Sequence, residues 1–152
     1  MIKPGELAAA AGVGLAAGLA GTAAMTLSSS VEAKVRQRPA STAPADAAGK
    51  VLGVKPEGDE QARRFSTIVH WAYGTSWGAL RGLLGCTGLP VPAASAVHMS
   101  VLWGTEQVVL PALGVSPPLT EWGAKEIAID AGHHVVYAAA TSTAYELLNR
   151  TR

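Results

Sequence analysis

Four long apolar stretches, separated by short polar segments, make up most of the 152-residue chain. They cover residues 7–27, about 65–85, about 93–113 and about 123–147. A bilayer core about 30 Å thick is crossed by roughly 20 residues of α-helix, and helices suit lipid because every backbone N–H finds its partner within the helix. The pattern therefore predicts an all-α integral membrane bundle of four transmembrane helices.

Proline and glycine mark the breaks between the last three stretches, at residues 88–92 (GLPVP) and 114–118 (GVSPP). Proline lacks the amide donor that a helix needs, so helices end readily at such points. Residues 39–49, rich in Pro, Ala, Ser and Thr, are typical of a linker without a core of its own. We therefore expect a first transmembrane helix at 1–27, a soluble linker at 28–64 and a three-helix membrane core at 65–152.

A cleaved signal peptide is the alternative for the first stretch, with a small-residue cleavage site near Ala23 and Ala24. Against it, Lys3 is the one basic residue ahead of the apolar run, and the run exceeds the 7–15 residues of a signal core. The spacing of Gly14 and Gly18 favours a packed helix, because small residues four apart let two helix backbones approach closely. Tight packing within the chain and a dimer interface both fit that spacing.

The composition narrows the functional classes. Hydrophobic residues make up 49% of the chain and charged residues 15%, whereas a soluble domain carries about 25% charged residues. A net charge of +1 gives no basic stripe for nucleic acid. A single cysteine, Cys86, excludes an intramolecular disulfide framework and a cysteine-based zinc site. No phosphate loop, nucleophile elbow or Ser-His-Asp order is present in the sequence, so we expect a protein that is not an enzyme.

The distribution of basic residues predicts the orientation. The linker holds seven Lys and Arg residues, and the same-side loop before the fourth stretch adds Lys125. The opposite side holds Lys3, Arg81, Arg150 and Arg152. Because cytoplasmic segments carry the excess of Lys and Arg, we expect the linker in the cytoplasm and both termini outside. The four tryptophans are typical of anchors at the membrane surface and of packing.

Ionisable side chains inside the apolar stretches are the candidate functional residues, since each costs at least about 2.5 kcal/mol in lipid. At 1.5 Å per residue, most of them fall in one layer within about 8 Å of depth near the linker side. Arg81 and His98 fall in a separate layer nearer the opposite side. On the fourth stretch the four-residue spacing forms one polar stripe. The candidates are His70, Glu106, Glu126, Asp130, His133 and His134.

Three interpretations of this layer remain open. It is a buried hydrogen-bonded network that fixes helix register, a proton-handling site in which histidine lies beside a carboxylate, or a metal or haem site. Haem would need two histidines that face each other, His70 with His133 or His134. The Asp130-x-x-His133 spacing is similar to the acidic-x-x-His pairs of di-iron bundles. The candidate metal ligands are His70, Glu106, Asp130 and His134.

The second half of the chain resembles the YagU-like inner-membrane proteins of bacteria. The resemblance covers roughly residues 64–150 and rests on the turn at 111–118 (PALGVSPP), followed by Glu126-x-x-x-Asp130-x-x-x-His134-Val135-Val136-Tyr137. His70 also matches a family histidine. The chain departs from the family pattern at Asp130, where the family has Glu, and at Gln107, near a family histidine. The resemblance implies a multi-pass protein of the bacterial inner membrane with a part in acid tolerance, and it supplies no catalytic residues.

These observations favour proton-linked transport or acid-stress tolerance through the His/carboxylate layer. One alternative is a structural or accessory subunit of a larger membrane complex, and another is a metal- or haem-binding membrane protein. The expected partners are the lipid bilayer and either further copies of the chain or a larger membrane complex, without nucleic acid.

Overall fold

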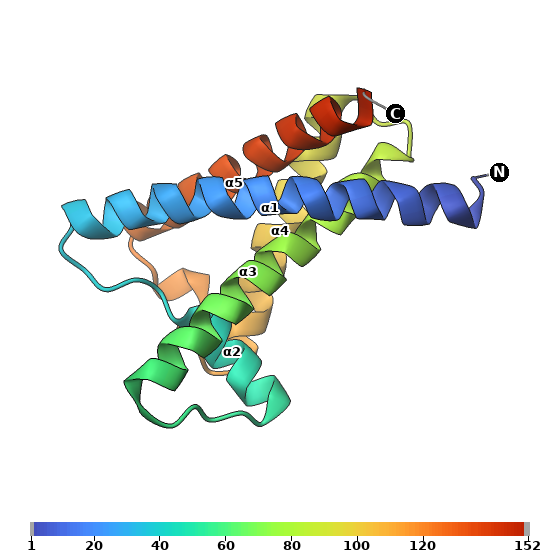
Figure 1. The fold of residues 1–152 in the computed structure, drawn as a ribbon. Coiled ribbons are helices and arrows are strands. Elements are labelled where there is room, and N and C mark those ends of the chain that lie inside the picture. Colours follow the sequence, from blue (N-terminus) through green and yellow to red (C-terminus); the bar gives the residue numbers. More distant parts are fainter. Residues whose placement is uncertain (1, 151–152) are drawn as a thin grey trace.

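Five α-helices and one short 3₁₀ helix form the structure, a computed structural model that describes residues 2–150 (Figure 1). No strand occurs in this range, so the expected all-α class is confirmed. Residues 1, 151 and 152 lie outside it, and with them Arg152, which counted toward the expected orientation. The elements are α1 (Pro4–Val35), α2 (Ala43–Leu52), α3 (Gly58–Gly85), α4 (Val91–Ala112), η1 (Leu119–Glu121) and α5 (Ala124–Arg150).

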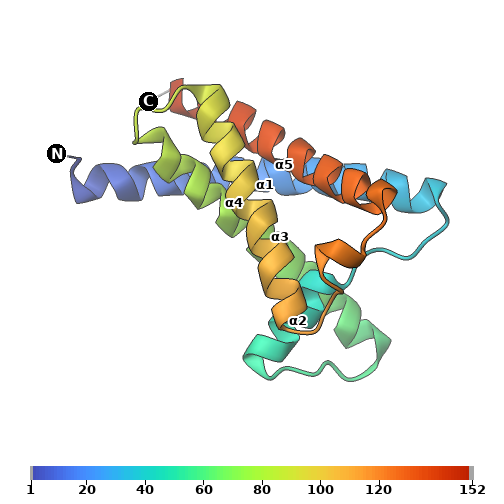
Figure 2. The ribbon, with the colours of Figure 1, turned by 180° about the vertical axis from the view of Figure 1, so that it is seen from behind.

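The helices α1 and α5 lie side by side and run in opposite directions, as both views show (Figures 1 and 2). The helix α3 crosses α1, and α4 packs against α5 and α3. The start of α1 and the end of α5 lie at the same end of the bundle (Figure 1). This arrangement places the inward faces of α4 and α5 against each other, where the polar stripe of the fourth stretch lies.

Glycines hold α1 and α3 in backbone contact. A Cβ atom added to Gly14 would overlap the backbone of Gly78 and Gly82, and one added to Gly78 would overlap Gly14 and Gly18 in return. Glycine is needed at these positions because any side chain would separate the two helices. The Gly14-x-x-x-Gly18 spacing thus serves packing within the chain, since α3 occupies that face of α1.

The linker contains a helix that the sequence analysis did not expect. Residues Ala43–Leu52 form α2, although the segment 39–49 was expected to be a linker without a core. A proline in its first turn favours helix initiation, and Ala45 is buried where α2 packs against α3. The Lys50 ammonium donates to the carbonyl oxygens of Leu113 and Gly114, at the end of α4. The helix itself was not predicted, and its one buried residue, Ala45, packs against α3 rather than within the linker.

The helix α1 is long and apolar enough to cross a membrane, with a mean hydropathy of 1.6 over 18 residues. It is the one helix among residues 2–150 that meets this test of length and composition. The helices α3, α4 and α5 have 28, 22 and 27 residues, which is sufficient length, but histidine, glutamate and arginine side chains lower their hydropathy. The structure therefore contains one membrane-span candidate in this range, where four were expected.

Small and apolar residues share the interior with several large polar side chains, and many large apolar side chains lie on the surface. The five largest fully buried side chains are Arg81, Tyr137, His98, Thr22 and Thr141. Across residues 2–150, 24 large hydrophobic side chains are exposed, among them leucines and valines of all four long helices. Exposed apolar residues also occur on soluble proteins, so the buried arginine and histidine are the informative observation.

Candidate functional site

Two carboxylates and one imidazole meet between α4 and α5. Glu106 comes from α4, whereas Asp130 and His134 come from α5, where their four-residue spacing puts them on one face. The Nε2 atom of His134 lies 2.7 Å from Oε2 of Glu106, and its Nδ1 atom lies 3.8 Å from Oδ2 of Asp130. We call Glu106, Asp130 and His134 the α4–α5 cluster. It brings together three of the six residues singled out from the sequence.

The hydrogen bonds of His134 show where its protons lie. Its Nδ1 atom is 2.9 Å from the backbone carbonyl oxygen of Asp130, which can only accept, so Nδ1 carries a hydrogen. The Nε2 atom then either accepts a proton from the Glu106 carboxyl group or donates one to its carboxylate. In both arrangements a single proton lies between Nε2 and Oε2. His134 is buried, and the two carboxylates are partly exposed.

Trp103 completes the cluster from α4. Its indole Nε1–H donates to Oδ2 of Asp130 over 2.7 Å. Because an indole can only donate, this bond fixes one carboxylate oxygen as an acceptor and orients the side chain toward His134. The sequence analysis assigned the tryptophans to anchoring and packing and missed this role. The signal was available, since Trp103 lies three residues before Glu106 and therefore on the same face of its helix.

His133 faces a different helix from its neighbour His134. Its Nδ1 atom is hydrogen-bonded to the Ser28 hydroxyl of α1 over 2.8 Å. Its Nε2 atom lies 3.8 Å from Oε2 of Glu32, also on α1, and makes no hydrogen bond. Successive residues of a helix point about 100° apart, so His133 turns to α1 while His134 turns to α4.

Ion pairs tie the end of α1 to the start of α5. Arg36 donates to both carboxylate oxygens of Glu126, over 2.9 and 2.6 Å, and Arg38 and Arg36 both donate to Glu32. The bonds from Arg38, and after them those from Arg36, hold the pKa of Glu32 at about 2, below its ordinary 4.5, although desolvation acts in the opposite direction. The pairs with Glu126 and Glu32 raise the pKa of the Arg36 guanidinium above its ordinary value.

His70 packs against α1 as well. Its Nε2 atom lies 2.8 Å from the Thr26 hydroxyl oxygen. That hydroxyl donates its own hydrogen to the carbonyl oxygen of Thr22, so it accepts the hydrogen of His70. His70 therefore does not join the α4–α5 cluster. The expected layer divides into the α4–α5 cluster, the contacts of His133 and Glu126 with α1, and the His70–Thr26 contact.

A second buried polar group lies between α3, α4 and α5. Arg81, with 1% of its side chain exposed, donates from Nη2 to Glu146 over 2.8 Å and from Nε to the Ser142 hydroxyl over 3.0 Å. Ser95 of α4 donates to the same hydroxyl oxygen. The guanidinium also lies 4.6 Å from the centre of the Tyr145 ring. This group matches the separate layer expected for Arg81.

Glu146 and Ser142 are hydrogen-bond partners of Arg81 that were not singled out from the sequence. Both continue the α5 stripe, because 130, 134, 138, 142 and 146 follow one another at four-residue spacing. His98 lies in the same region, where its Nε2–H donates to the Trp77 carbonyl oxygen over 3.0 Å and its Nδ1 atom makes no hydrogen bond. Its ring also contacts Tyr137, whose hydroxyl donates to the Gly74 carbonyl oxygen.

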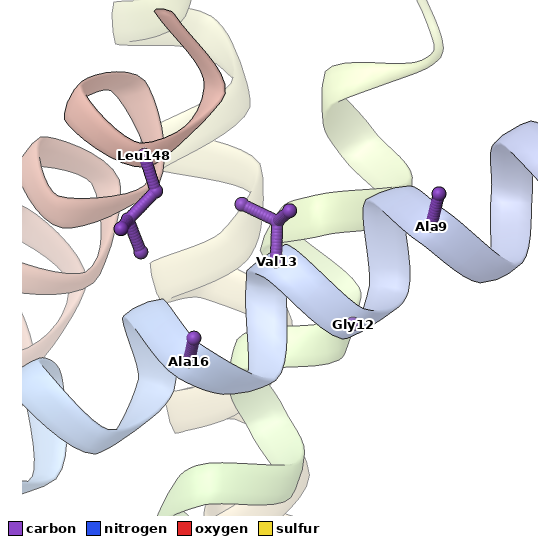
Figure 3. Close-up of a pocket in the computed structure, with 5 residues that line it drawn as sticks. All are labelled: Ala9, Gly12, Val13, Ala16 and Leu148. Atoms are coloured by element: carbon purple, nitrogen blue, oxygen red, sulfur yellow. The ribbon is translucent and has the colours of Figure 1, made fainter. Parts of the chain in front are cut away.

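A shallow depression on the outer face of α1 carries no chemistry of its own. It is bounded by small and aliphatic side chains of α1 and by Leu148 of α5 (Figure 3). No polar side chain lines it, so it offers neither an acid, a base nor a ligand for an ion. The lining residues are Ala9, Gly12, Val13, Ala16 and Leu148. The ionisable side chains of the α4–α5 cluster remain the candidate site.

The α4–α5 cluster offers three ligand atoms that could hold a metal ion. One ligand atom each from Glu106, Asp130 and His134 lies within 4.8 Å of the others. Of the four candidate metal ligands expected from the sequence, His70 is the one outside this group, because it faces Thr26. The histidines considered for haem are directed at different partners, His70 at Thr26, His133 at Ser28 and His134 at Glu106.

Comparison of the chain with protein-family models, with curated proteins and with solved structures finds no match. The resemblance of the second half to the YagU-like proteins therefore stays a prediction. Any functional conclusion must come from the residues of the chain itself.

Proposed function

We propose that the chain is a small, multi-pass integral protein of the bacterial inner membrane that holds a cation at the α4–α5 cluster. In this proposal the protein takes part in proton-linked transport or in acid-stress tolerance. The role in this proposal is not an enzymatic one. The observation that carries the proposal is the meeting of two carboxylates and one imidazole inside a bundle with an apolar exterior.

The distribution of side chains supports the membrane part of the proposal. A soluble bundle buries many leucines and valines, whereas this chain buries Arg81 and His98 beside two leucines and exposes leucine or valine side chains on every long helix. Lipid accepts the exposed apolar surface, and polar side chains must then face one another. The small residues between α1 and α3 agree with this, because close backbone approach is how helices associate in lipid.

Charge balance supports the cation. When both are ionised, Glu106 and Asp130 place like charges close together at partly buried positions, which is costly unless an opposite charge is near. The single imidazole of His134 balances one carboxylate at most. A cation held between the three side chains balances the second one.

The crossing of the membrane by α3 is tested with cysteine labelling. Cys86 follows α3, and Ser41 precedes α2 in the linker, so the two positions lie on opposite sides in this proposal. In spheroplasts, an impermeant maleimide should label native Cys86 directly. It should label Ser41→Cys, in a Cys86→Ser background, only after permeabilisation. Labelling of both positions from the same side would contradict the crossing.

The role of the cluster is tested with isosteric substitutions. Glu106→Gln and Asp130→Asn keep the shape of each side chain and remove its charge. Both variants should insert into membranes and elute as the wild type does, yet lose acid survival in a strain that depends on this protein. Glu60→Gln is the matched control, because Glu60 lies on the exposed start of α3. Wild-type acid survival in both cluster variants would contradict the proposed role.

A further inference from the structure

We propose that the cation held by Glu106, Asp130 and His134 is a divalent first-row transition metal ion of the class of Mn²⁺, Fe²⁺ and Zn²⁺. This inference rests on the cation-holding function proposed above and adds the identity of the ion. Imidazole together with carboxylates favours these metals, whereas Mg²⁺ and Ca²⁺ prefer oxygen ligands alone. The site has no thiolate, because the chain's one cysteine follows α3.

The ligand atoms converge from two helices. Asp130 and His134 are one helical turn apart on α5, which lets a single ion bind both, and Glu106 approaches from α4. Their three ligand atoms lie within 4.8 Å of one another. Bonds of about 2.0–2.2 Å to one ion hold ligand atoms at most about 4.4 Å apart, so a small side-chain movement completes the site. Three protein ligands leave coordination positions open for water or for an exchanging partner.

Outer contacts hold two of the three ligands in place. The Nδ1–H of His134 donates to the Asp130 carbonyl oxygen over 2.9 Å, which directs Nε2 at Glu106. The Trp103 indole donates over 2.7 Å to Oδ2 of Asp130, the oxygen that lies 3.8 Å from His134. Metal-binding histidines and carboxylates in proteins are oriented by such hydrogen bonds. His133 and His70 lack this setting because they bond to hydroxyl groups of α1.

The experiment uses the full chain, purified in detergent, stripped with a chelator and titrated with Mn²⁺, Zn²⁺ or Mg²⁺ alone. Calorimetry and elemental analysis should give one Mn²⁺ or Zn²⁺ per chain and no Mg²⁺ binding. The variants His134→Ala and Asp130→Asn should bind at least about 100-fold more weakly, beyond the 10–100-fold effect of losing an outer partner. The matched control is His133→Ala, which removes the neighbouring histidine and should keep wild-type affinity.

Three results would overturn the inference. They are the absence of Mn²⁺ and Zn²⁺ binding by the folded wild type, equal binding by Asp130→Asn, and equal loss in His133→Ala. The variant Glu106→Gln, which preserves side-chain volume, covers the case in which His134→Ala does not fold. The acid-survival assay distinguishes a failure of the metal inference from a failure of the proposed function. Cluster variants that lose acid survival while the wild type binds no metal would reject the metal and retain the cation-holding role.

Discussion

The guanidinium of Arg81 on α3 lies 2.8 Å from the carboxylate of Glu146 on α5, 65 residues further along the chain. The arginine is 1% exposed and the glutamate 29% exposed, so this ion pair joins two helices from the inside. A buried charge that loses its partner is strongly destabilising, because neither water nor another charge replaces the lost interaction.

Glu146→Gln should therefore destabilise the bundle by about 3 kcal/mol, the lower end of the range for breaking a buried pair, because Glu146 retains some exposure. The measurement is thermal unfolding of the purified protein in detergent, with Glu60→Gln as the exposed control. A loss of less than about 0.5 kcal/mol, as expected for an exposed pair, would contradict the structural role of the Arg81–Glu146 contact.

Gly78→Ala should prevent the close approach of α1 and α3, because the added Cβ atom would meet the backbone of Gly14 and Gly18. We expect a destabilisation of about 1–3 kcal/mol, as for overpacking of a core. The matched control is Gly12→Ala, on the same helix as Gly14, where a Cβ atom meets nothing within 4 Å and the gain in helix propensity is about 0.5–1 kcal/mol. Unfolding temperatures that change equally in the two variants would be inconsistent with the contact.

Stability should fall in acid through Glu32. Its pKa is about 2 in the folded chain and 4.5 ordinarily, so the unfolded chain takes up the proton more readily. The stabilisation is therefore fully present above about pH 4.5 and is lost as the pH falls toward 2. Unfolding temperatures of the wild type and Glu32→Gln, measured between pH 6 and pH 2.5, should converge as the pH falls. A constant difference across that range would show that the Arg38 and Arg36 bonds do not lower this pKa.

Trp103→Phe should weaken metal binding at the α4–α5 cluster without removing a ligand. The indole donates to Asp130, and loss of such an outer hydrogen bond lowers metal affinity by about 10–100-fold. Calorimetric titration with Mn²⁺ measures the effect, and Trp77→Phe is the control on α3. Equal affinities of Trp103→Phe and the wild type would mean that Asp130 is oriented without the indole.

Much of the helical architecture was predictable from local patterns. The apolar stretches and the prolines at 88–92 and 114–118 place α3, α4 and α5 within a few residues of their observed ends, except that α3 begins at Gly58, earlier than residue 65. The helix α2 was missed, although Pro44 in its first turn and Gly53 at its C-terminal end are local signals of a helix. The contacts of Ala45 with α3 and of Lys50 with Leu113 come only from the tertiary structure. The membrane crossings of α3, α4 and α5 remain a proposal.

The candidate site was predictable in its residue types and only partly in its grouping. The four-residue spacing of Asp130 and His134 fixed their common face, and depth along the helices brought Glu106 to the same level. Depth alone placed His70 and His133 in that layer too. The structure separates them, because depth is set by position along a helix, whereas the partner is set by rotation about its axis.

Local sequence patterns were sufficient to predict the helical class, the approximate positions of the long helices and the polar stripe of α5, since backbone hydrogen bonding and side-chain periodicity are local. The tertiary structure decided which helix each polar side chain meets. His133 and His134 are adjacent in the chain, yet one bonds to Ser28 and the other pairs with Glu106. The physical reason is the 100° turn between successive helical residues, which has a consequence only once α1 and α4 pack against different sides of α5.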